Sequence, residues 1–260
     1  DLLSELKISS NCFISGFGVT DGIAQKLRNY DVSVNISLNG STETINSFSR
    51  DGYSYAIQAL RIFMYNGIRY GINWVARNDN INDFENMLVL AERYHAQSIL
   101  ILGNKMTNTG VVQSKLTCKG LELLINKIKK YELSNGPIII EKQRCFTELC
   151  TLYYNTRNSI HLGCPAGVVL CTMDLSGRFY PCSHLHYPDN CTSIYEYWHN
   201  SETLHNLRSC NATNSIPCSG CVYSEGCKFC KAESLLTHND FNSGNPNCNI
   251  YRHKEIDHAK

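Results

Sequence analysis

The chain has 260 residues, of which 43% are hydrophobic, so it can bury the core of one large domain or of two ordinary ones. Its 24 basic and 23 acidic side chains give a formal net charge of +1, which favours neither nucleic acid nor an anionic membrane as a partner. No run of about eighteen apolar residues exists, so we expect no membrane span, and we expect a cytoplasmic protein. The start at Asp1, without Met, reads as a cut rather than a natural beginning.

Hydrophobic periodicity predicts alternating strands and helices before residue 110. The predicted elements are, in chain order, a short helix at 1–7, strand 11–18, a helix capped by Thr20 or Asp21, strand 32–38, helix 53–66, strand 69–76, helix 82–91 and strand 99–102. In strand 32–38, aliphatic residues alternate with Ser33, Asn35 and Ser37, so one face is apolar and the other polar. We expect Gly67 to end helix 53–66 and the pair Asn82 and Glu85 to cap the next helix.

This order of elements is typical of a parallel sheet, either open or closed into a barrel, and we therefore predict an α/β fold. Functional side chains are then expected where the strands end. The candidates are Gly16 to Gly18, Ser37 with Asn39, Asn73 with Arg77, and Gly103 with Asn104. The alternative is that these groups only cap the backbone of the strands and loops.

The second half of the chain is built differently. A helix at 116–131 and a strand at 138–140 connect to it, so we place the domains at 1–110, 111–160 and 161–260. Segments 168–173 and 178–182 flank a tight turn that contains Gly177, which predicts a β-hairpin. A helical element is expected at about 195–207.

Ten of the 14 cysteines lie between Cys164 and Cys248. Thiolates hold zinc in tetrahedral sites and iron in iron–sulfur clusters, so spacing alone does not choose the metal. Eight cysteines are enough for two sites of four thiolates each, namely Cys164, Cys171, Cys182, Cys218, Cys221, Cys227, Cys230 and Cys248. We expect the other cysteines to be inert thiols in the protein interior.

The cysteine pattern resembles the SPASM domain of radical S-adenosylmethionine enzymes. The pattern runs Cys164, Gly177, Cys182 and then a loop from Cys218 to Cys230, with a distant last cysteine. Residues 175–182 (LSGRFYPC) resemble the hairpin of that domain, and residues 36–40 (ISLNG) and 67–73 (GIRYGIN) resemble the middle of the family's barrel. The resemblance implies a partial (βα) barrel, followed by a small cysteine-rich domain with a β-hairpin and short helices.

The resemblance also implies two auxiliary [4Fe-4S] clusters with interleaved ligands. The first would be held by Cys164, Cys171, Cys182 and Cys230, and the second by Cys218, Cys221, Cys227 and Cys248. This chain has two residues between the third and fourth cysteines of the loop, where the family usually has three. Cys210 or Cys191 is therefore an alternative to Cys230, and Cys171 has the alternative of packing inside the hairpin.

For the intact enzyme, the resemblance implies cleavage of S-adenosylmethionine at a catalytic [4Fe-4S] cluster, giving a 5'-deoxyadenosyl radical. That radical would take hydrogen from a peptide or protein substrate, with an electron donor as a further partner. Ser37, Asn39, Asn73 and Arg77 would contact S-adenosylmethionine. The family's Cys-x3-Cys-x2-Cys pattern is absent from these residues, so we expect them not to generate the radical alone.

Two other classes of protein remain open. One is a binding or scaffold protein without catalysis, stabilised by zinc in four-cysteine sites. The other is a secreted disulfide protein, which is favoured only by the even number of cysteines.

Overall fold

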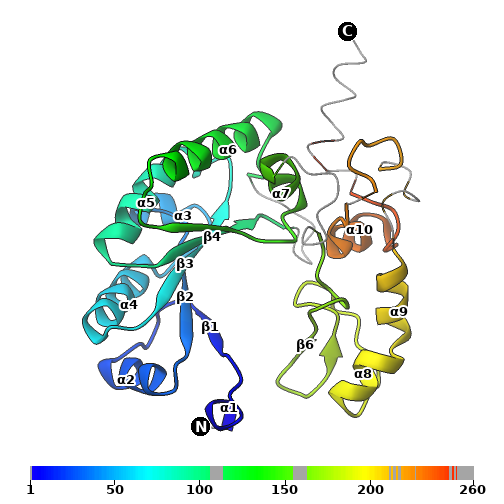
Figure 1. Ribbon diagram of the computed structural model, residues 1–260, viewed down its shortest axis with the longest axis horizontal. Coiled ribbons are helices and arrows are strands. Elements are labelled where there is room, and N and C mark those ends of the chain that lie inside the picture. The colour runs from blue at the N-terminus through cyan, green and yellow to red at the C-terminus, as the bar shows by residue number, and fades with distance from the viewer. Residues whose placement is uncertain are drawn as a thin grey trace. The chain divides into compact units, whose positions relative to one another are not determined.

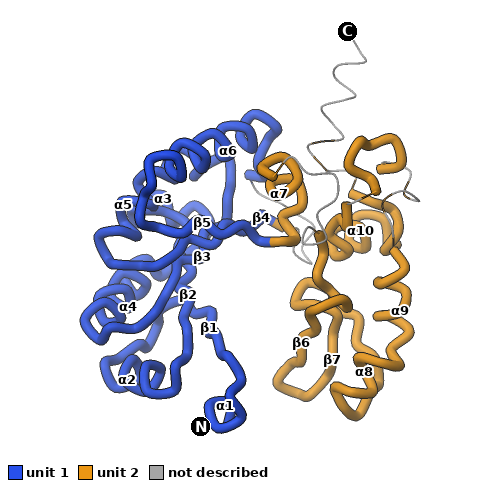
Figure 2. The backbone as a smooth tube through the Cα atoms, in the orientation of Figure 1, with its two compact units in different colours: residues 1–104, 114–143 blue, residues 105–113, 144–260 orange. Residues whose placement is uncertain are grey.

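The computed structural model describes residues 2–105, 114–154, 163–210, 212, 215, 218–225, 227–245, 248 and 250. Figure 2 shows its two compact units, which we call unit 1 (residues 1–104 and 114–143) and unit 2 (residues 105–113 and 144–260). The domain boundaries expected near residues 110 and 160 stay a prediction.

Unit 1 contains a five-stranded sheet in which all neighbouring strands are parallel. Its strands follow chain order, and they are β1 (Asn11–Ile14), β2 (Ser33–Ser37), β3 (Tyr70–Ala76), β4 (Ser98–Gly103) and β5 (Ile139–Lys142). The helices are α1 (Leu2–Glu5), α2 (Asp21–Asn29), α3 (Glu43–Ser47), α4 (Tyr53–Asn66), the 3-10 helix η1 (Ile81–Asp83), α5 (Phe84–Arg93) and α6 (Cys118–Leu133). Helices α2, α4, α5 and α6 lie along one side of the sheet (Figure 1). The predicted α/β fold is confirmed, and the sheet is compatible with a partial barrel.

Local sequence explains where these elements begin and end. The Thr20 hydroxyl accepts a hydrogen bond from the backbone N–H of Ile23 at 3.3 Å, so it caps α2 as predicted. Gly67 has a φ of 62°, and this left-handed conformation ends α4 as predicted. Ile36 of β2 and Trp74 of β3 are fully buried, which places the core on the apolar face of the sheet.

The cap expected at Asn82 and Glu85 is wrong. The residue before α5 is Asp83, and no side chain caps that helix. Asp83 is buried, and its carboxylate accepts hydrogen bonds from the backbone N–H and the hydroxyl of Ser41, each at 2.6 Å. The acidic side chain at the start of α5 therefore fixes the loop after β2 rather than the helix terminus.

A row of asparagine side chains crosses the polar face of the sheet. Asn11 of β1 donates to Asn35 of β2 at 3.0 Å, and Asn35 donates to Asn73 of β3 at 3.0 Å. The strand register places Ser33 and Ser37 on the same face. Asn35 and Asn73 are 8% and 5% exposed, so their hydrogen bonds offset much of the cost of burying the amides.

Gly71 makes this row possible. It lies opposite Asn35 in the register, and a β-carbon at position 71 would stand 3.0 Å from the Asn35 amide nitrogen and 2.6 Å from the Ser98 hydroxyl. Only a residue without a side chain lets the Asn35 amide reach the third strand.

Unit 2 contains a two-stranded antiparallel hairpin and four short described helices. The elements are α7 (Thr147–Tyr154), β6 (Thr172–Met173), β7 (Phe179–Tyr180), α8 (Ile194–Asn200), α9 (Glu202–Ser209) and α10 (Lys231–His238). The hairpin is confirmed, with Gly177 at a φ of 82° in its turn. No helix in the described part of either unit has the length and apolar character to cross a membrane.

The single helical element expected at about 195–207 is two helices. Ser201 lies between α8 and α9 with an extended backbone, and its hydroxyl accepts a hydrogen bond from the N–H of Leu204 at 3.0 Å. The same hydroxyl donates to Asp189, which also accepts from the Thr203 hydroxyl at 2.9 Å. A capping serine held by a carboxylate therefore begins a new helix at this position.

Asn35→Ala should lower the free energy of unfolding by about 2 kcal/mol, because the buried amide of Asn73 and the exposed amide of Asn11 would each lose a partner. Urea denaturation measures the change. Asn29→Ala is the control, since Asn29 is exposed at the end of α2 and its removal should cost less than about 0.5 kcal/mol. Equal stability of the two variants would contradict a structural role for the asparagine row.

Candidate cofactor and metal sites

Ser37 and Asn73, two of the expected S-adenosylmethionine contacts, are partners in the register of β2 and β3. Both lie on the polar face, with Ser37 at the carboxyl end of β2 and Asn73 in the middle of β3. Asn73 accepts a hydrogen bond from Asn35, which orients its amide. The structure therefore brings these two residues together on the face that the sequence predicted to be polar.

Asn39 lies at the centre of a buried hydrogen-bond network. Its side-chain oxygen accepts from the N–H of Val75 at 3.1 Å, and its side-chain nitrogen donates to the Ser49 hydroxyl at 2.9 Å. Its backbone N–H donates to the Asn46 side chain at 2.8 Å, and its carbonyl accepts from the Asn80 side chain at 3.0 Å. These bonds join the loop after β2 to β3, so Asn39 fixes the carboxyl edge of the sheet.

Arg77 is also buried and also paired. Its guanidinium donates to both carboxylate oxygens of Asp79, at 2.9 and 2.6 Å, and these bonds hold the pKa of Asp79 below its usual value. Its backbone N–H donates to the Asn80 side chain at 2.8 Å. The sequence did not single out Asn80, because its role depends on contacts with residues of another loop.

The first predicted cysteine set gathers in the hydrophobic core of unit 2. Cys164 and Cys230 belong to that core, and Cys171 and Cys182 pack against it. The rings of Phe179 and Tyr197 stack within the same core, with centroids 5.4 Å apart. Of the two alternatives to Cys230, Cys191 also packs against this core, whereas the thiol of Cys210 donates to the carbonyl of Asn206 at 3.2 Å.

A close backbone contact brings Cys164 beside the loop that ends at Cys230. The N–H of Cys164 donates to the carbonyl of Lys228 at 2.6 Å. Gly163 has a φ of 115°, and a β-carbon there would stand 2.5 Å from the β-carbon of Lys228. The absence of a side chain at Gly163 is therefore a condition for this contact.

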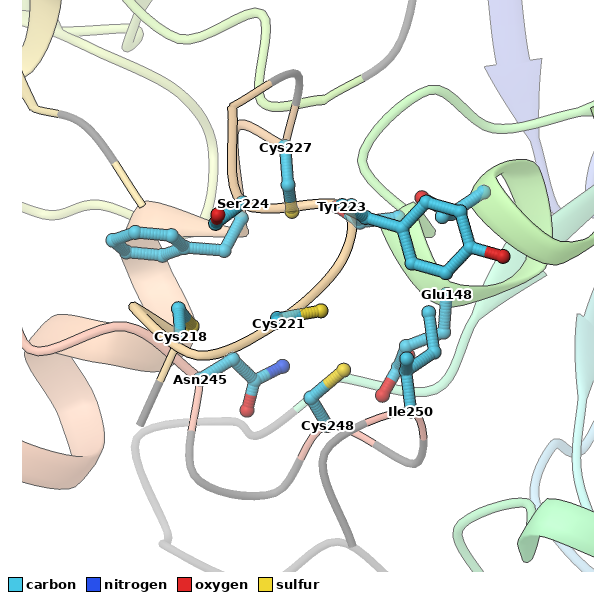
Figure 3. A pocket seen from close by; sticks show the side chains of 12 residues that line it. Glu148, Cys218, Cys221, Tyr223, Ser224, Cys227, Asn245, Cys248 and Ile250 are labelled. Atoms are coloured by element: carbon cyan, nitrogen blue, oxygen red, sulfur yellow. The ribbon is translucent and has the colours of Figure 1, made fainter. Parts of the chain in front are cut away.

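The second predicted cysteine set lines one cavity. Cys218, Cys221, Cys227 and Cys248 all border it, together with Thr147 and Glu148 of α7 and other residues of unit 2. Figure 3 shows the sulfur atoms of Cys221, Cys227 and Cys248 turned toward the same space. Residues far apart in the sequence thus supply four thiols to one cavity.

The chemistry of these thiols suits metal binding. Burial raises the pKa of Cys227 to about 12, and the neighbouring thiols of Cys218 and Cys221 act in the same direction. Burial also raises the pKa of Cys218 and Cys182, while backbone N–H groups donated to each sulfur act against it. Neighbouring thiols disfavour one another's negative charge, and a bound cation removes this cost when they lose their protons.

Backbone N–H groups already point at cysteine sulfurs in both sets. The donors are those of Asn245 to Cys218, His184 and Leu185 to Cys182, and Glu233 to Cys230. Hydrogen bonds of this kind stabilise thiolates and tune the potentials of iron–sulfur clusters.

Buried polar atoms without a partner provide a test of whether a cofactor fits. Among the described residues of unit 2 these atoms are the hydroxyls of Thr147 and Tyr197 and the ammonium nitrogen of Lys231. Thr147 lines the cavity of the second set. Tyr197 interacts electrostatically with Asp189 and also with Cys171, Cys191 and Cys182. Lys231 interacts electrostatically with Cys210 and also with Cys164, Cys227 and Cys230. All three donors thus lie beside cysteines, where sulfur atoms of a bound cluster would accept from them, and both sets fit such a group.

Lys105 places a positive charge near cysteines of the first set. Its ammonium donates to the sulfur of Cys145 at 2.8 Å. Although burial opposes its charge, the neighbouring thiols of Cys230, Cys145 and Cys164 raise its pKa above the usual value. A charged lysine here favours negative charge on the cysteines of this set.

In the described part of the chain, no group of three or more His, Cys, Asp and Glu side chains is arranged to hold a single ion.

Comparison with solved structures gives close matches in fold. The chain superposes on the crystal structure of Streptococcus suis SuiB bound to S-adenosylmethionine with a TM-score of 0.75 and 16% identity, over 95% of this chain and 60% of SuiB. SuiB bound to the precursor peptide SuiA matches with a TM-score of 0.76. The fold of this chain is therefore that of the solved SuiB structures. The fold implied by the sequence resemblance is thereby confirmed.

A second solved protein has the same fold. Native anSMEcpe with bound AdoMet matches with a TM-score of 0.67 and 14% identity, over 94% of this chain and 71% of that one. No protein-family model and no curated protein matches the sequence. The likeness therefore lies in three-dimensional structure, and the chain spans about 60% of the length of SuiB.

The metal-free protein should lose stability at high pH. Burial raises the pKa of both Cys227 and Cys230 from 9.0 to about 12, so the neutral thiols stabilise the folded state fully below pH 9 and progressively less as the pH rises toward 12. Thermal melting from pH 7 to 11 measures this loss. Cys227→Ala should lose less stability over that range than the control Cys12→Ala, and equal losses would contradict the raised pKa of Cys227.

Proposed function

We propose that this chain is part of a radical S-adenosylmethionine enzyme that modifies a peptide or protein substrate and carries two auxiliary [4Fe-4S] clusters in unit 2. The observation that carries the proposal is the convergence of Cys218, Cys221, Cys227 and Cys248 on one cavity, in a chain whose fold matches SuiB and anSMEcpe. Because the chain spans part of SuiB, the activity is assigned to the whole protein.

The two ligand sets follow the assignment made from sequence. Cys164, Cys171, Cys182 and Cys230 hold the first auxiliary cluster, and the packing of all four in one core supports this set. The thiols around the cavity hold the second cluster. We assign Cys230 rather than Cys210 to the first set, since the Cys210 thiol is buried against its own helix and donates to Asn206.

Bound clusters of this type supply electron transfer or a binding point for substrate. The residues of this chain hold and shield them. Thr147 and Tyr197 donate hydrogen bonds to sulfur, Lys105 favours negative charge at the first site, and the apolar core around Phe179 excludes water. Low water access and N–H donors both affect cluster potentials.

The polar face of unit 1 is our proposed contact surface for S-adenosylmethionine. Ser37 and Asn73 present hydroxyl and amide groups there, and they are our proposed direct contacts. Asn39 and Arg77 hold the loops at the carboxyl edge through hydrogen bonds of their side chains. If either residue contacts S-adenosylmethionine, it does so with side-chain groups that already form hydrogen bonds within the protein. The 260 residues contain no Cys-x3-Cys-x2-Cys pattern for the catalytic cluster.

A peptide substrate has direct support from the solved relatives. SuiB has been seen bound to its precursor peptide SuiA, and anSMEcpe has been seen with AdoMet and the Kp18Cys peptide. An electron donor and a cytoplasmic location complete the proposal. No nucleic acid or membrane partner is included, in keeping with the near-neutral charge.

Anaerobic reconstitution with iron and sulfide tests the proposal against the zinc scaffold. We expect a brown protein with about eight iron and eight sulfide per chain, since each [4Fe-4S] cluster contributes four of each. Iron and sulfide assays with metal analysis give the result. A colourless product that binds zinc after the same treatment would refute the iron–sulfur proposal in favour of structural zinc.

Cys221→Ala should remove one cluster and leave about four iron per chain, because Cys221 borders the cavity of the second set. It should also lower the melting temperature of unit 2, since metal binding is coupled to folding. Cys12→Ala is the matched control, because Cys12 lies on β1 of unit 1 and its loss should leave the iron content unchanged. Full iron content in Cys221→Ala would reject Cys221 as a ligand.

A further inference from the structure

Glu148 is a buried acidic residue in the wall of the second cysteine cavity. It lies in the first turn of α7 and is 6% exposed. It lines the same cavity as the four thiols of Cys218, Cys221, Cys227 and Cys248. Among the described residues that line this cavity, no other Asp, Glu, Lys, Arg or His side chain is present. One carboxylate therefore supplies the fixed charge of the cavity wall.

The cavity and the carboxylate belong to one unit. Residues 144–260 all lie in unit 2, and Figure 3 shows Glu148 on the α7 side of the space toward which the sulfur atoms of Cys221 and Cys248 are turned. Burial and the thiols of Cys218 and Cys221 raise the pKa of Cys227, and the charge of Glu148 acts in the same direction. The position of Glu148 thus places its charge close to the sulfur atoms of this set.

The surroundings of Glu148 strengthen the effect of its charge. Burial favours the neutral acid, but the backbone N–H groups in the first turn of a helix and the helix dipole favour a carboxylate there. Phe229 and Ile250 contribute apolar surface to the same cavity. Because apolar surroundings screen charges less than water does, a carboxylate in this wall interacts strongly with any charge in the cavity.

A negative charge beside an iron–sulfur cluster opposes its reduction. The reduced cluster carries one more negative charge than the oxidised cluster, so a nearby carboxylate destabilises the reduced form more. The potential of the cluster is then lower, and the reduced cluster is a stronger electron donor. A charge that lines one cavity acts mainly on the cluster in that cavity, since the effect declines with distance.

We propose that the negative charge of Glu148 selectively lowers the reduction potential of the second auxiliary cluster. The proposal rests on the proposed function, because it needs a cluster on Cys218, Cys221, Cys227 and Cys248. The reduction is the gain of one electron by this cluster from a low-potential reductant, with no bond or proton exchanged.

The test compares Glu148 variants of the anaerobically reconstituted full chain. Midpoint potentials are measured by titration with dithionite, and the reduced clusters are followed by electron paramagnetic resonance. Glu148→Gln removes the charge and keeps the shape, so it should raise the potential of the second cluster by about a tenfold change in the one-electron equilibrium constant, or about 59 mV. Glu148→Asp keeps the charge and should retain most of the wild-type potential.

Glu225→Gln is the matched control. Glu225 lies in the cysteine loop between Cys221 and Cys227, but it is exposed, so water and salt screen its charge. Its replacement should leave both potentials close to the wild-type values. The backgrounds Cys164→Ala and Cys221→Ala assign each potential to its site, because the first should retain the second cluster and the other should retain the first cluster.

The outcomes separate the two proposals. Wild-type protein without iron would refute the proposed function. Wild-type protein with both clusters, but with an unchanged second potential in Glu148→Gln, would overturn the role of Glu148, and so would an equal shift of both potentials. If Glu148→Gln holds only one cluster, Glu148→Met is a second neutral variant for the same titration. Loss of the second cluster in both neutral variants would assign the carboxylate to cluster binding and would also overturn the role proposed here.

Discussion

The hydrogen bond from the Cys164 N–H to the Lys228 carbonyl is the contact on which unit 2 depends. It joins the segment before the hairpin to the cysteine loop, and it forms only because Gly163 lets the two backbones touch. Once joined, Cys164 and Cys230 share one apolar core, and α10 begins directly after Cys230. The remaining cysteines of the loop border the cavity beside α7. The thiols therefore form two groups, one in the apolar core and one around the cavity.

The two units treat buried polar groups in opposite ways. In unit 1, the buried amides of Asn35 and Asn73 bond to each other, and Asn35 also accepts a hydrogen bond from the exposed Asn11, so these buried groups have partners within the protein. In the described part of unit 2, donors beside the cysteines are left without acceptors. Trp74 of unit 1 is also unpaired, but its indole lies in the apolar core. A network in which every polar group is hydrogen-bonded is typical of a structural scaffold. Buried donors without acceptors favour the binding of a cofactor that has many acceptor atoms.

Sequence patterns predicted what depends on neighbouring residues along the chain. The alternation in residues 32–38 gave the polar and apolar faces of β2, and the apolar spacing before Gly67 gave α4. Predictions failed where a distant side chain intervened, as when Ser41 bound Asp83 and when Asp189 held Ser201 between two helices. The sequence could not single out Lys231, because the burial of its ammonium nitrogen and the absence of a hydrogen-bond acceptor beside it are visible only in the folded structure.

The core of unit 2 has a consequence for how the protein is made. A ribosome releases Cys164, Cys171 and Cys182 well before it releases Cys230, which completes their core. During that interval three thiols are exposed to oxygen and to one another, and neither the core nor its shielding from water exists. This nascent segment therefore needs a reducing environment until α10, which follows Cys230, has emerged. The distance along the chain between Cys182 and Cys230 thus leaves these thiols open to oxidation before the core that buries them has formed.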